Sequence, residues 1–328
     1  MADRTDRPFP CVPRSRGGPS HALKSKRSDA GGKNMKLIGE NLNIMSAVYG
    51  KALKEKNAKP LQELAIQQAE LGMDWIDLNI GPAGKTGEEL MAWLVPVIHE
   101  VVDLPLALDT SNIKAIAAGL KAHKKGRPLI NSIMVRPERM EALLPLAAEY
   151  DAEFVGLLWG PEGMPRDENE RGALCAEIVF KATGEFGINP ERIYVDPIQT
   201  PVNVQQQQIL SVLEFMKMFP EIAPGCRSTI GLSNVSNGPP DHLRPILNQV
   251  MVILLKRYGL YSAIVDCFDT KLHEVARGKR PDLEALVHKV EDGQPIDTKA
   301  LTPEEVEYVK TAKVILGHQL YSDSWLEV

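Results

Sequence analysis

The sequence has few cysteines, and none of them forms a pair at metal-binding spacing. Its 328 residues contain four, which are Cys11, Cys175, Cys226 and Cys267, without a Cys-x-x-Cys motif. Scattered single cysteines argue against a disulfide framework and are typical of a reducing compartment, so we expect a cytoplasmic protein. No histidine stands at metal-ligand spacing from a cysteine, and we therefore expect no metal on this chain.

Long hydrophobic runs and an excess of positive charge are missing too. No apolar run approaches the roughly 20 residues that a transmembrane helix needs, so we expect no membrane partner. The chain has 38 Lys and Arg against 43 Asp and Glu, which gives a net charge of -5 at pH 7. A chain of this charge is not expected to have nucleic acid as its main partner.

Residues 1–34 differ in composition from the remainder of the chain. They are rich in proline, glycine and serine and carry a net charge of +5, whereas the remainder carries -10. Because they lack apolar periodicity and the apolar core of a secretory signal, we expect a disordered basic leader. We expect the native start at Met35, or an added leader before it, and one folded domain over residues 35–328.

Several motifs of well-known catalytic sites are absent. The sequence contains no Gly-x-Ser-x-Gly elbow, no Gly-x-Gly-x-x-Gly loop and no Asp-x-His-x-x-Gly corrinoid-binding signature. Neither the nucleophile of an α/β-hydrolase nor a dinucleotide-binding loop is therefore indicated.

One pattern repeats from Met35 onward: a short apolar run ends in a polar residue, and a helix-length amphipathic segment follows. The runs are residues 36–43, 75–80, 104–112, 128–133, 153–159, 192–197, 228–234 and 262–267. Eight predicted strands that alternate with helices indicate an α/β fold of the (β/α)₈ barrel type. A doubly wound open sheet is the competing arrangement, and it usually has fewer strands.

The pattern loosens after the eighth run. Residues 270–306 are charged and helix-prone, with a turn at 291–295. We expect a helical insertion after strand eight, followed by a last helix over residues 304–320. Two interpretations of the insertion stay open, a solvated surface elaboration and a docking surface for a partner.

Polar side chains stand at the ends of nearly all the predicted strands. They include Glu40, Asn41, Asn43, Asp77, Asn79, Asp109, Asn131, Asp196, Ser233, Asn234 and Asp266. Any one of them is explained by a helix N-cap, but in a barrel the whole set converges at one mouth. Carboxylates accept hydrogen bonds and amides both donate and accept, so the set suits a flat heterocycle with N–H, C=O and amine groups. The absence of Lys and Arg from these ends argues against a phosphate site.

Seven short motifs occur in the order and at the spacing of one known family. They are "GENLN" (39–43), "DLNIGPA" (77–83), "LALDTSNIKAIAAGL" (106–120), "LINS" (129–132), "YVDPI" (194–198), "TPVNV" (200–204) and "GLSNVS" (231–236). Together they resemble the pterin-binding barrel methyltransferases, in particular the methyltetrahydrofolate:corrinoid protein methyltransferases. The resemblance covers residues 36–270 and resumes at 315–325.

The resemblance implies a role for the residues at the ends of four strands. Asp109, Asn131 and Asp196 match the family residues that hold the pterin ring. Asp77 matches a residue near the same pocket. These four are therefore expected to bind the pterin part of a folate.

The resemblance assigns the segment after strand seven to the reacting end of the folate. Asn234 matches the family asparagine that faces N5, which makes it the expected catalytic residue, and Ser233 and Arg244 are expected to contact the folate. An amide serves N5 both before and after its protonation state changes, because it offers a donor and an acceptor. Asn237 departs from the family, which has glutamine there.

The family reaction is an SN2 methyl transfer between N5 of tetrahydrofolate and the cobalt of a corrinoid on a separate protein. The resemblance thus implies tetrahydrofolate or 5-methyltetrahydrofolate as substrate, a corrinoid protein as partner and a homodimer. The length of the insertion is closer to the folate methyltransferase components of corrinoid-dependent demethylase systems. The alternatives are a tetrahydromethanopterin-type methyltransferase subunit, dihydropteroate synthase and a non-catalytic folate-binding barrel. Dihydropteroate synthase has Ser-Arg-Lys in place of "SNVS" and needs a pyrophosphate site.

Overall fold

Eight parallel strands form the centre of the computed structural model, which describes residues 35–327. The expected leader at residues 1–34 lies outside this described part. The strands are β1 (Lys36–Gly39), β2 (Trp75–Asn79), β3 (Leu106–Asp109), β4 (Leu129–Met134), β5 (Glu153–Leu157), β6 (Ile193–Asp196), β7 (Arg227–Ser228) and β8 (Ser262–Val265). Their order in the sheet is β7-β6-β5-β4-β3-β2-β1-β8.

The sheet curls until its two edge strands meet. Just beyond β7, the amide of Ile264 in β8 donates to the carbonyl of Ile230 at 2.8 Å, and Gly231 forms a parallel bridge with Ile264. The predicted barrel is thereby confirmed. The predicted seventh strand was too long, because β7 ends at Ser228 and residues Leu232–Ser236 form the 3-10 helix η3.

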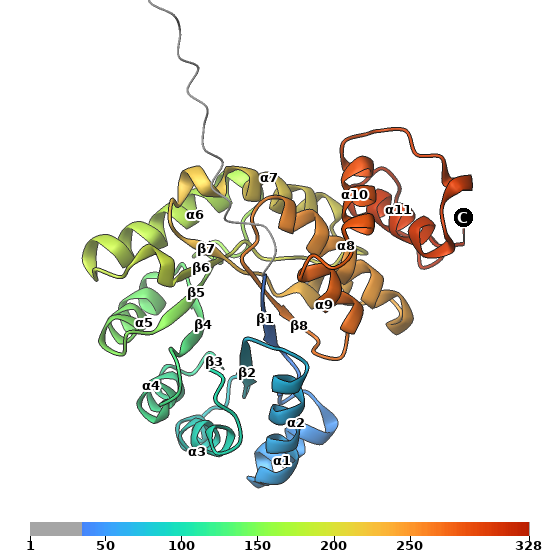
Figure 1. Cartoon of the computed structure of the whole chain (residues 1–328). Helices are drawn as coiled ribbons and strands as arrows, with labels where there is room; N and C mark the ends of the chain where they lie inside the picture. The colour runs from blue at the N-terminus through green and yellow to red at the C-terminus, as the bar shows by residue number, and fades with distance from the viewer. Residues whose placement is uncertain (1–34, 328) are drawn as a thin grey trace, which may run out of the picture.

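Helices cover the outside of the barrel (Figure 1). They are α1 (Ala47–Glu55), α2 (Ala58–Glu70), α3 (Gly87–His99), α4 (Ile113–Ala122), α5 (Pro137–Glu149), α6 (Glu168–Phe180), α7 (Gln206–Ile222) and α8 (Arg244–Arg257). The short helix α1 is capped by Ser46, whose side chain accepts a hydrogen bond from Tyr49 N. Gly72, Gly187 and Gly259 follow helical segments, and all three have a positive φ, of 83°, 62° and 83°. In the described part of the chain no helix is long and apolar enough to cross a membrane.

The interior of the barrel is layered by the two-residue period of its strands. A buried apolar cluster inside the barrel consists of Ile38, Trp75, Ala107, Leu129, Val155 and Tyr194. Five of these six residues are followed two positions later by Glu40, Asp77, Asp109, Asn131 and Asp196. Side chains at i and i+2 point to the same face of a strand, so the apolar layer lies beneath a polar layer at the carboxyl ends.

Three helices follow β8. They are α9 (Thr270–Ala276), α10 (Pro281–Glu291) and α11 (Pro303–Ile315). The expectation of a helical insertion is thus confirmed, and the inserted helices also have a buried face. Leu272, Val275, Leu283 and Val287 are buried in the same core cluster as the outer faces of the barrel strands.

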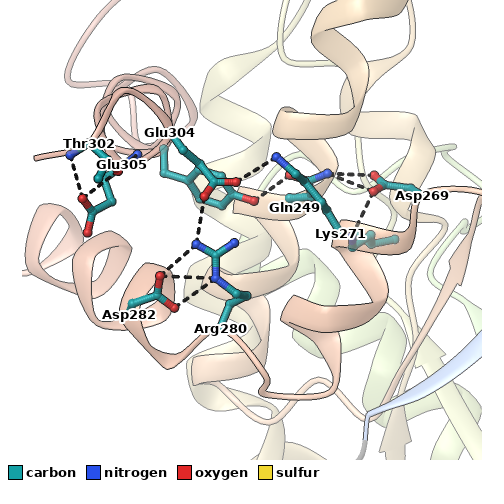
Figure 2. Close-up of polar contacts among 10 residues, drawn as sticks. Gln249, Asp269, Lys271, Arg280, Asp282, Thr302, Glu304 and Glu305 are labelled. Atoms are coloured by element: carbon teal, nitrogen blue, oxygen red, sulfur yellow. Dashed lines mark hydrogen bonds and ion pairs between the residues drawn. The ribbon is translucent and has the colours of Figure 1, made fainter.

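Polar contacts also join these three helices to α8 (Figure 2). Gln249 of α8 donates to both carboxylate oxygens of Asp269, at 2.9 and 3.1 Å, and accepts a hydrogen bond from Tyr308 of α11 at 2.6 Å. Glu304 accepts hydrogen bonds from Lys271 and Arg280, at 2.8 and 2.9 Å. The segment after β8 is therefore an integral part of the domain.

We expect the C-terminal segment to contribute strongly to stability through Trp325. Its side chain is 0% exposed, and its indole N–H donates to Thr311 at 3.0 Å. Trp325→Ala leaves a large cavity and should lower the free energy of unfolding by about 3–5 kcal/mol. Leu320→Ala is the control, because Leu320 is 83% exposed. Thermal denaturation of the two variants measures the effect, and equal melting temperatures would contradict this packing role.

Candidate active site

Two aspartates form a carboxyl pair at the mouth of the barrel. Asp77 is only 2% exposed, and its pKa is raised well above the ordinary value by burial, by the charge of Asp109 and by a hydrogen bond between the two groups. Burial raises the pKa of Asp109 as well, while its hydrogen bond from Asp77 partly offsets this rise. Two buried carboxyl groups this close cannot both be ionised without a large cost, so we infer that the pair shares one proton.

Two amides hold this pair in place. Asn131 Nδ2 donates to Asp77 Oδ1 at 3.1 Å, and Asn79 Nδ2 donates to Asp109 Oδ2. Asn79, Asp109 and Asn131 are register partners on β2, β3 and β4. The structure therefore brings three of the predicted pterin residues, Asp77, Asp109 and Asn131, into one hydrogen-bonded group.

Asp196 ends β6 and is held by backbone amides. Its Oδ1 accepts from Ile198 N at 2.8 Å and its Oδ2 from Gly231 N at 3.3 Å, which ties β6 to the segment after β7. Burial raises its pKa to about 6, against the lowering effect of these two hydrogen bonds. Ile198 has a φ of 67°, a strained conformation for a β-branched residue. Such strain tends to occur at functional sites.

The predicted N5 contact lies on the short helix η3. Asn234 is exposed, and its backbone amide donates to Gly231 O at 3.2 Å. Its neighbour Ser233 donates from Oγ to Glu40 Oε1 at 2.6 Å, across to the end of β1. The pKa of Glu40 is raised, mainly by burial. Hydrogen bonds therefore link η3 to both β1 and β6.

Arg244 lies at the start of α8, after η3. Its Nε donates to Ser236 Oγ at 3.4 Å, and the charge of Arg244 partly offsets the raised pKa of Glu40. The structure thus places Arg244 on the side of the mouth formed by β1, η3 and α8.

The helix caps near the barrel mouth come from residues beyond the strand ends, not from the predicted pterin residues. Asn112 caps α4 by accepting from the amides of Lys114 and Ala115, and Asp269 caps α9 by accepting from Leu272. The side-chain hydrogen bonds of Asp77, Asp109, Asn131 and Asp196 instead go to one another, to Asn79 and to the backbone at positions 198 and 231. Helix capping therefore does not explain why these four polar side chains stand at the ends of their strands.

Sequence reasoning missed one basic residue at this end of the barrel. Arg139 in α5 donates to the carbonyl oxygens of Ser111 and Ser132, at 2.7 and 3.1 Å, just beyond β3 and within β4. Burial lowers its pKa. A search restricted to strand ends could not find it, because Arg139 stands in the first turn of a helix.

A cavity of about 500 Å³ opens beside these residues. Its wall comes from β1, η3, η4 (Asp241–Leu243), α8 and the segment after β8, and it includes Ser233 and Arg244. Within residues 35–327, no group of three or more His, Cys, Asp and Glu side chains is arranged to hold a metal ion.

Comparisons with known proteins agree with this arrangement. The model of the pterin binding enzyme family matches residues 40–266. The methylcorrinoid:tetrahydrofolate methyltransferase of Eubacterium limosum is 31% identical over 234 residues, which cover 71% of this chain and 85% of that protein. The methionine synthase of Mycobacterium leprae (strain TN) is 27% identical over 239 residues. That match covers 70% of this chain, which spans only 20% of that longer protein.

A solved structure shows the same fold. Dihydropteroate synthase from Xanthomonas albilineans superimposes with a TM-score of 0.58 over 76% of this chain and 93% of that one. At 18% identity this likeness concerns the fold alone.

Asp196 should make the stability of the protein depend on pH. Its pKa is raised from 3.8 to about 6, so the folded protein binds this proton more tightly than the unfolded chain. The stabilising contribution is complete below pH 3.8 and is lost as the pH rises through about 6. Asp196→Asn does not ionise. Between about pH 4 and pH 7 we therefore expect it to gain about 1–3 kcal/mol relative to the wild type.

Urea denaturation at several pH values measures this difference. Asp241→Asn is the control, because Asp241 is exposed at the same end of the barrel. Parallel stability profiles for the wild type and Asp196→Asn would show that Asp196 titrates normally.

Proposed function

This chain belongs to the pterin-binding enzyme family, and we propose that it transfers a methyl group between N5 of tetrahydrofolate and the cobalt of a corrinoid on a partner protein. The observation that carries the proposal is the hydrogen-bonded group of Asp77, Asp109 and Asn131 at the barrel mouth. The Eubacterium limosum relative, whose name states this reaction from methylcorrinoid to tetrahydrofolate, supports it.

We assign the pterin ring to Asp109, Asn131 and Asp196, with Asp77 behind them. None of the carboxyl groups of Asp77, Asp109 and Asp196 forms an ion pair within the described part of the chain. Buried carboxyl groups of this kind favour a ligand that donates N–H hydrogen bonds, because such donors recover the lost hydration. Asn131 adds an amide that both donates and accepts. A pterin offers N–H, amine and carbonyl groups on one flat edge, which matches these residues.

We assign Asn234 to N5. The methyl group moves without its bonding electrons, so N5 keeps the electron pair in one direction and supplies it in the other. The corrinoid provides the cobalt that accepts or donates the methyl group. Asn234 can donate to N5 while the electron pair develops and accept from N5 once it is protonated. A contact that strengthens in the transition state is what raises the rate.

We assign Ser233 and Arg244 to the rest of the folate. Ser233 is fixed by Glu40 and Arg244 lies across η3, so both border the side of the mouth next to Asn234. A homodimer and a role in one-carbon metabolism stay predictions that rest on the family resemblance, and a cytoplasmic location stays a prediction that rests on the scattered cysteines. Size-exclusion chromatography with light scattering tests the homodimer.

The alternative functions have less support than methyl transfer. The names of the Eubacterium limosum and Mycobacterium leprae relatives denote methyl-transfer enzymes, and the first names tetrahydrofolate. The likeness to dihydropteroate synthase concerns the fold alone, and the carboxylates that border the cavity do not suit a pyrophosphate. Tetrahydromethanopterin has no specific feature of the site in its favour.

Asn234→Ala should slow methyl transfer much more than it weakens folate binding. Loss of one transition-state hydrogen bond is expected to lower kcat/KM by about 10²-fold. The measurement follows the cobalt spectrum of methylcobalamin with tetrahydrofolate, and of Co(I) cobalamin with 5-methyltetrahydrofolate. Asn57→Ala is the control, because Asn57 is an exposed amide that makes no capping hydrogen bond. Equal rates for Asn234→Ala and the wild type would remove Asn234 from the mechanism.

The two aspartates of the carboxyl pair should respond differently to the same substitution. Asp77→Asn keeps a side chain of the same size with a hydrogen-bond donor, and Asp77 is only 2% exposed behind the proposed pterin contacts, so folate affinity should change by only a few-fold. Asp109→Asn removes the charged acceptor and should weaken folate binding by about 10- to 100-fold. Calorimetric titration with tetrahydrofolate compares the two variants, which are matched controls for each other. Equal losses would contradict the assignment of the direct pterin contact to Asp109.

A further inference from the structure

The cavity beside the pterin residues is a second compartment of the same mouth. Its lining residues include Glu40, Ser233, Arg244, Asn248 and Asp266. Ser233 and Arg244 are the members of the proposed folate set that border it, whereas the four pterin residues do not. The cavity of about 500 Å³ therefore has room for a ligand group other than the pterin ring.

The charges that border this cavity select against anions. Four carboxylates line it, from Glu40, Asp241, Asp266 and Asp269, against the single guanidinium of Arg244. A phosphate would meet like charge from four directions. A group that brings N–H donors fits these acceptors better.

One buried amide in the wall lacks a partner. Asn248 is 7% exposed, and its Oδ1 has no hydrogen bond to the described protein. A buried acceptor without a partner is unfavourable, and a ligand N–H would satisfy it. This observation is independent of the carboxylates and points to the same kind of ligand.

The acceptors around the cavity are held rigidly. Asp266 Oδ1 accepts from Asn41 Nδ2 at 2.7 Å, and Asp269 accepts from Gln249 at 2.9 and 3.1 Å (Figure 2). Gln249 is in turn bound by Tyr308 of α11 at 2.6 Å. The helices after β8 thus fix one wall of the cavity, which lowers the entropic cost of binding there.

We propose that this cavity binds a primary carboxamide arm of the corrinoid ring. A carboxamide brings two N–H donors for Asn248 Oδ1 and the carboxylates, and one carbonyl acceptor for Arg244. An ammonium group would offer nothing to Arg244, whose hydrogen bond to Ser236 is long at 3.4 Å. The edge of a corrinoid ring carries several such carboxamides.

The inference rests on the proposed function, which requires the corrinoid to reach Asn234. Ser233, the adjacent residue, borders the cavity, so a ring whose cobalt stands over the reacting methyl group has its edge near this wall. The cavity would then orient the corrinoid about the line of methyl transfer, which is a positioning effect.

The test compares cobalamin binding to the wild type and to Asn248→Leu. Leucine has nearly the same size and removes an amide that has no protein partner at Oδ1, so the variant should fold with unchanged or higher stability. We expect the Kd of cobalamin in equilibrium dialysis, and the KM of methylcobalamin, to rise about tenfold while folate affinity stays the same. Asn248→Asp, which adds a fifth carboxylate, should raise both further.

A series of cobalamin monocarboxylates, each with one carboxamide hydrolysed, identifies the contact. At least one isomer should bind the wild type about tenfold more weakly than cobalamin, and Asn248→Leu should not distinguish that isomer from cobalamin. Gln68→Leu is the matched control, since Gln68 is a fully buried amide without a partner that does not border the cavity.

Three results would overturn the proposal: an unchanged cobalamin Kd in Asn248→Leu, equal weakening for cobalamin and every monocarboxylate, or an effect that appears only with a corrinoid protein. The last result would show that Asn248 contacts the polypeptide of the corrinoid protein and not the corrinoid ring. A different result would show that the proposed function is wrong: the wild type itself would transfer no methyl group between any corrinoid and tetrahydrofolate.

Discussion

The two-residue period of the β-strand is the constraint on which the site depends. Inside the barrel, an apolar layer that includes Trp75, Ala107, Leu129 and Tyr194 fills the space, and the next inward residue on each of these strands is an Asp or Asn. The carboxyl groups cannot turn outward without reversing the strand, so they are buried at the mouth. Burial then raises the pKa of Asp77, Asp109 and Asp196.

A mouth of partly protonated carboxyl groups has a clear chemical preference. It binds N–H donors well and repels anions, and the same preference extends to the neighbouring cavity through Glu40, whose pKa is raised as well. The proposed folate and corrinoid contacts have the same physical basis. In both places, buried hydrogen-bond acceptors favour a neutral ligand that donates hydrogen bonds. The rest of the proposed chemistry depends on the orientation of the corrinoid toward the methyl group and on the amide of Asn234, which can donate to N5 or accept from it.

The helices after β8 connect to this mouth through Asp269. That residue caps α9 and is held by Gln249, which Tyr308 of α11 binds in turn. Their buried faces belong to the main core, with Val275 and Leu283 among the buried residues. The segment therefore stabilises the barrel and fixes one wall of the cavity. Neither interpretation of the sequence predicted that one segment has both roles.

The sequence by itself determined the barrel, because eight apolar runs alternating with amphipathic helices leave few other ways to bury their faces. It also identified Asp77, Asp109, Asn131 and Asp196 as candidates, since each stands at the carboxyl end of a strand. Only the tertiary structure decided which of these carboxyl groups interact. It also showed that β7 ends and η3 begins before Asn234, and that the side chains of Arg139 and Asn248 come to the mouth from helices. These features depend on contacts between residues far apart in the chain, and local periodicity carries no information about such contacts.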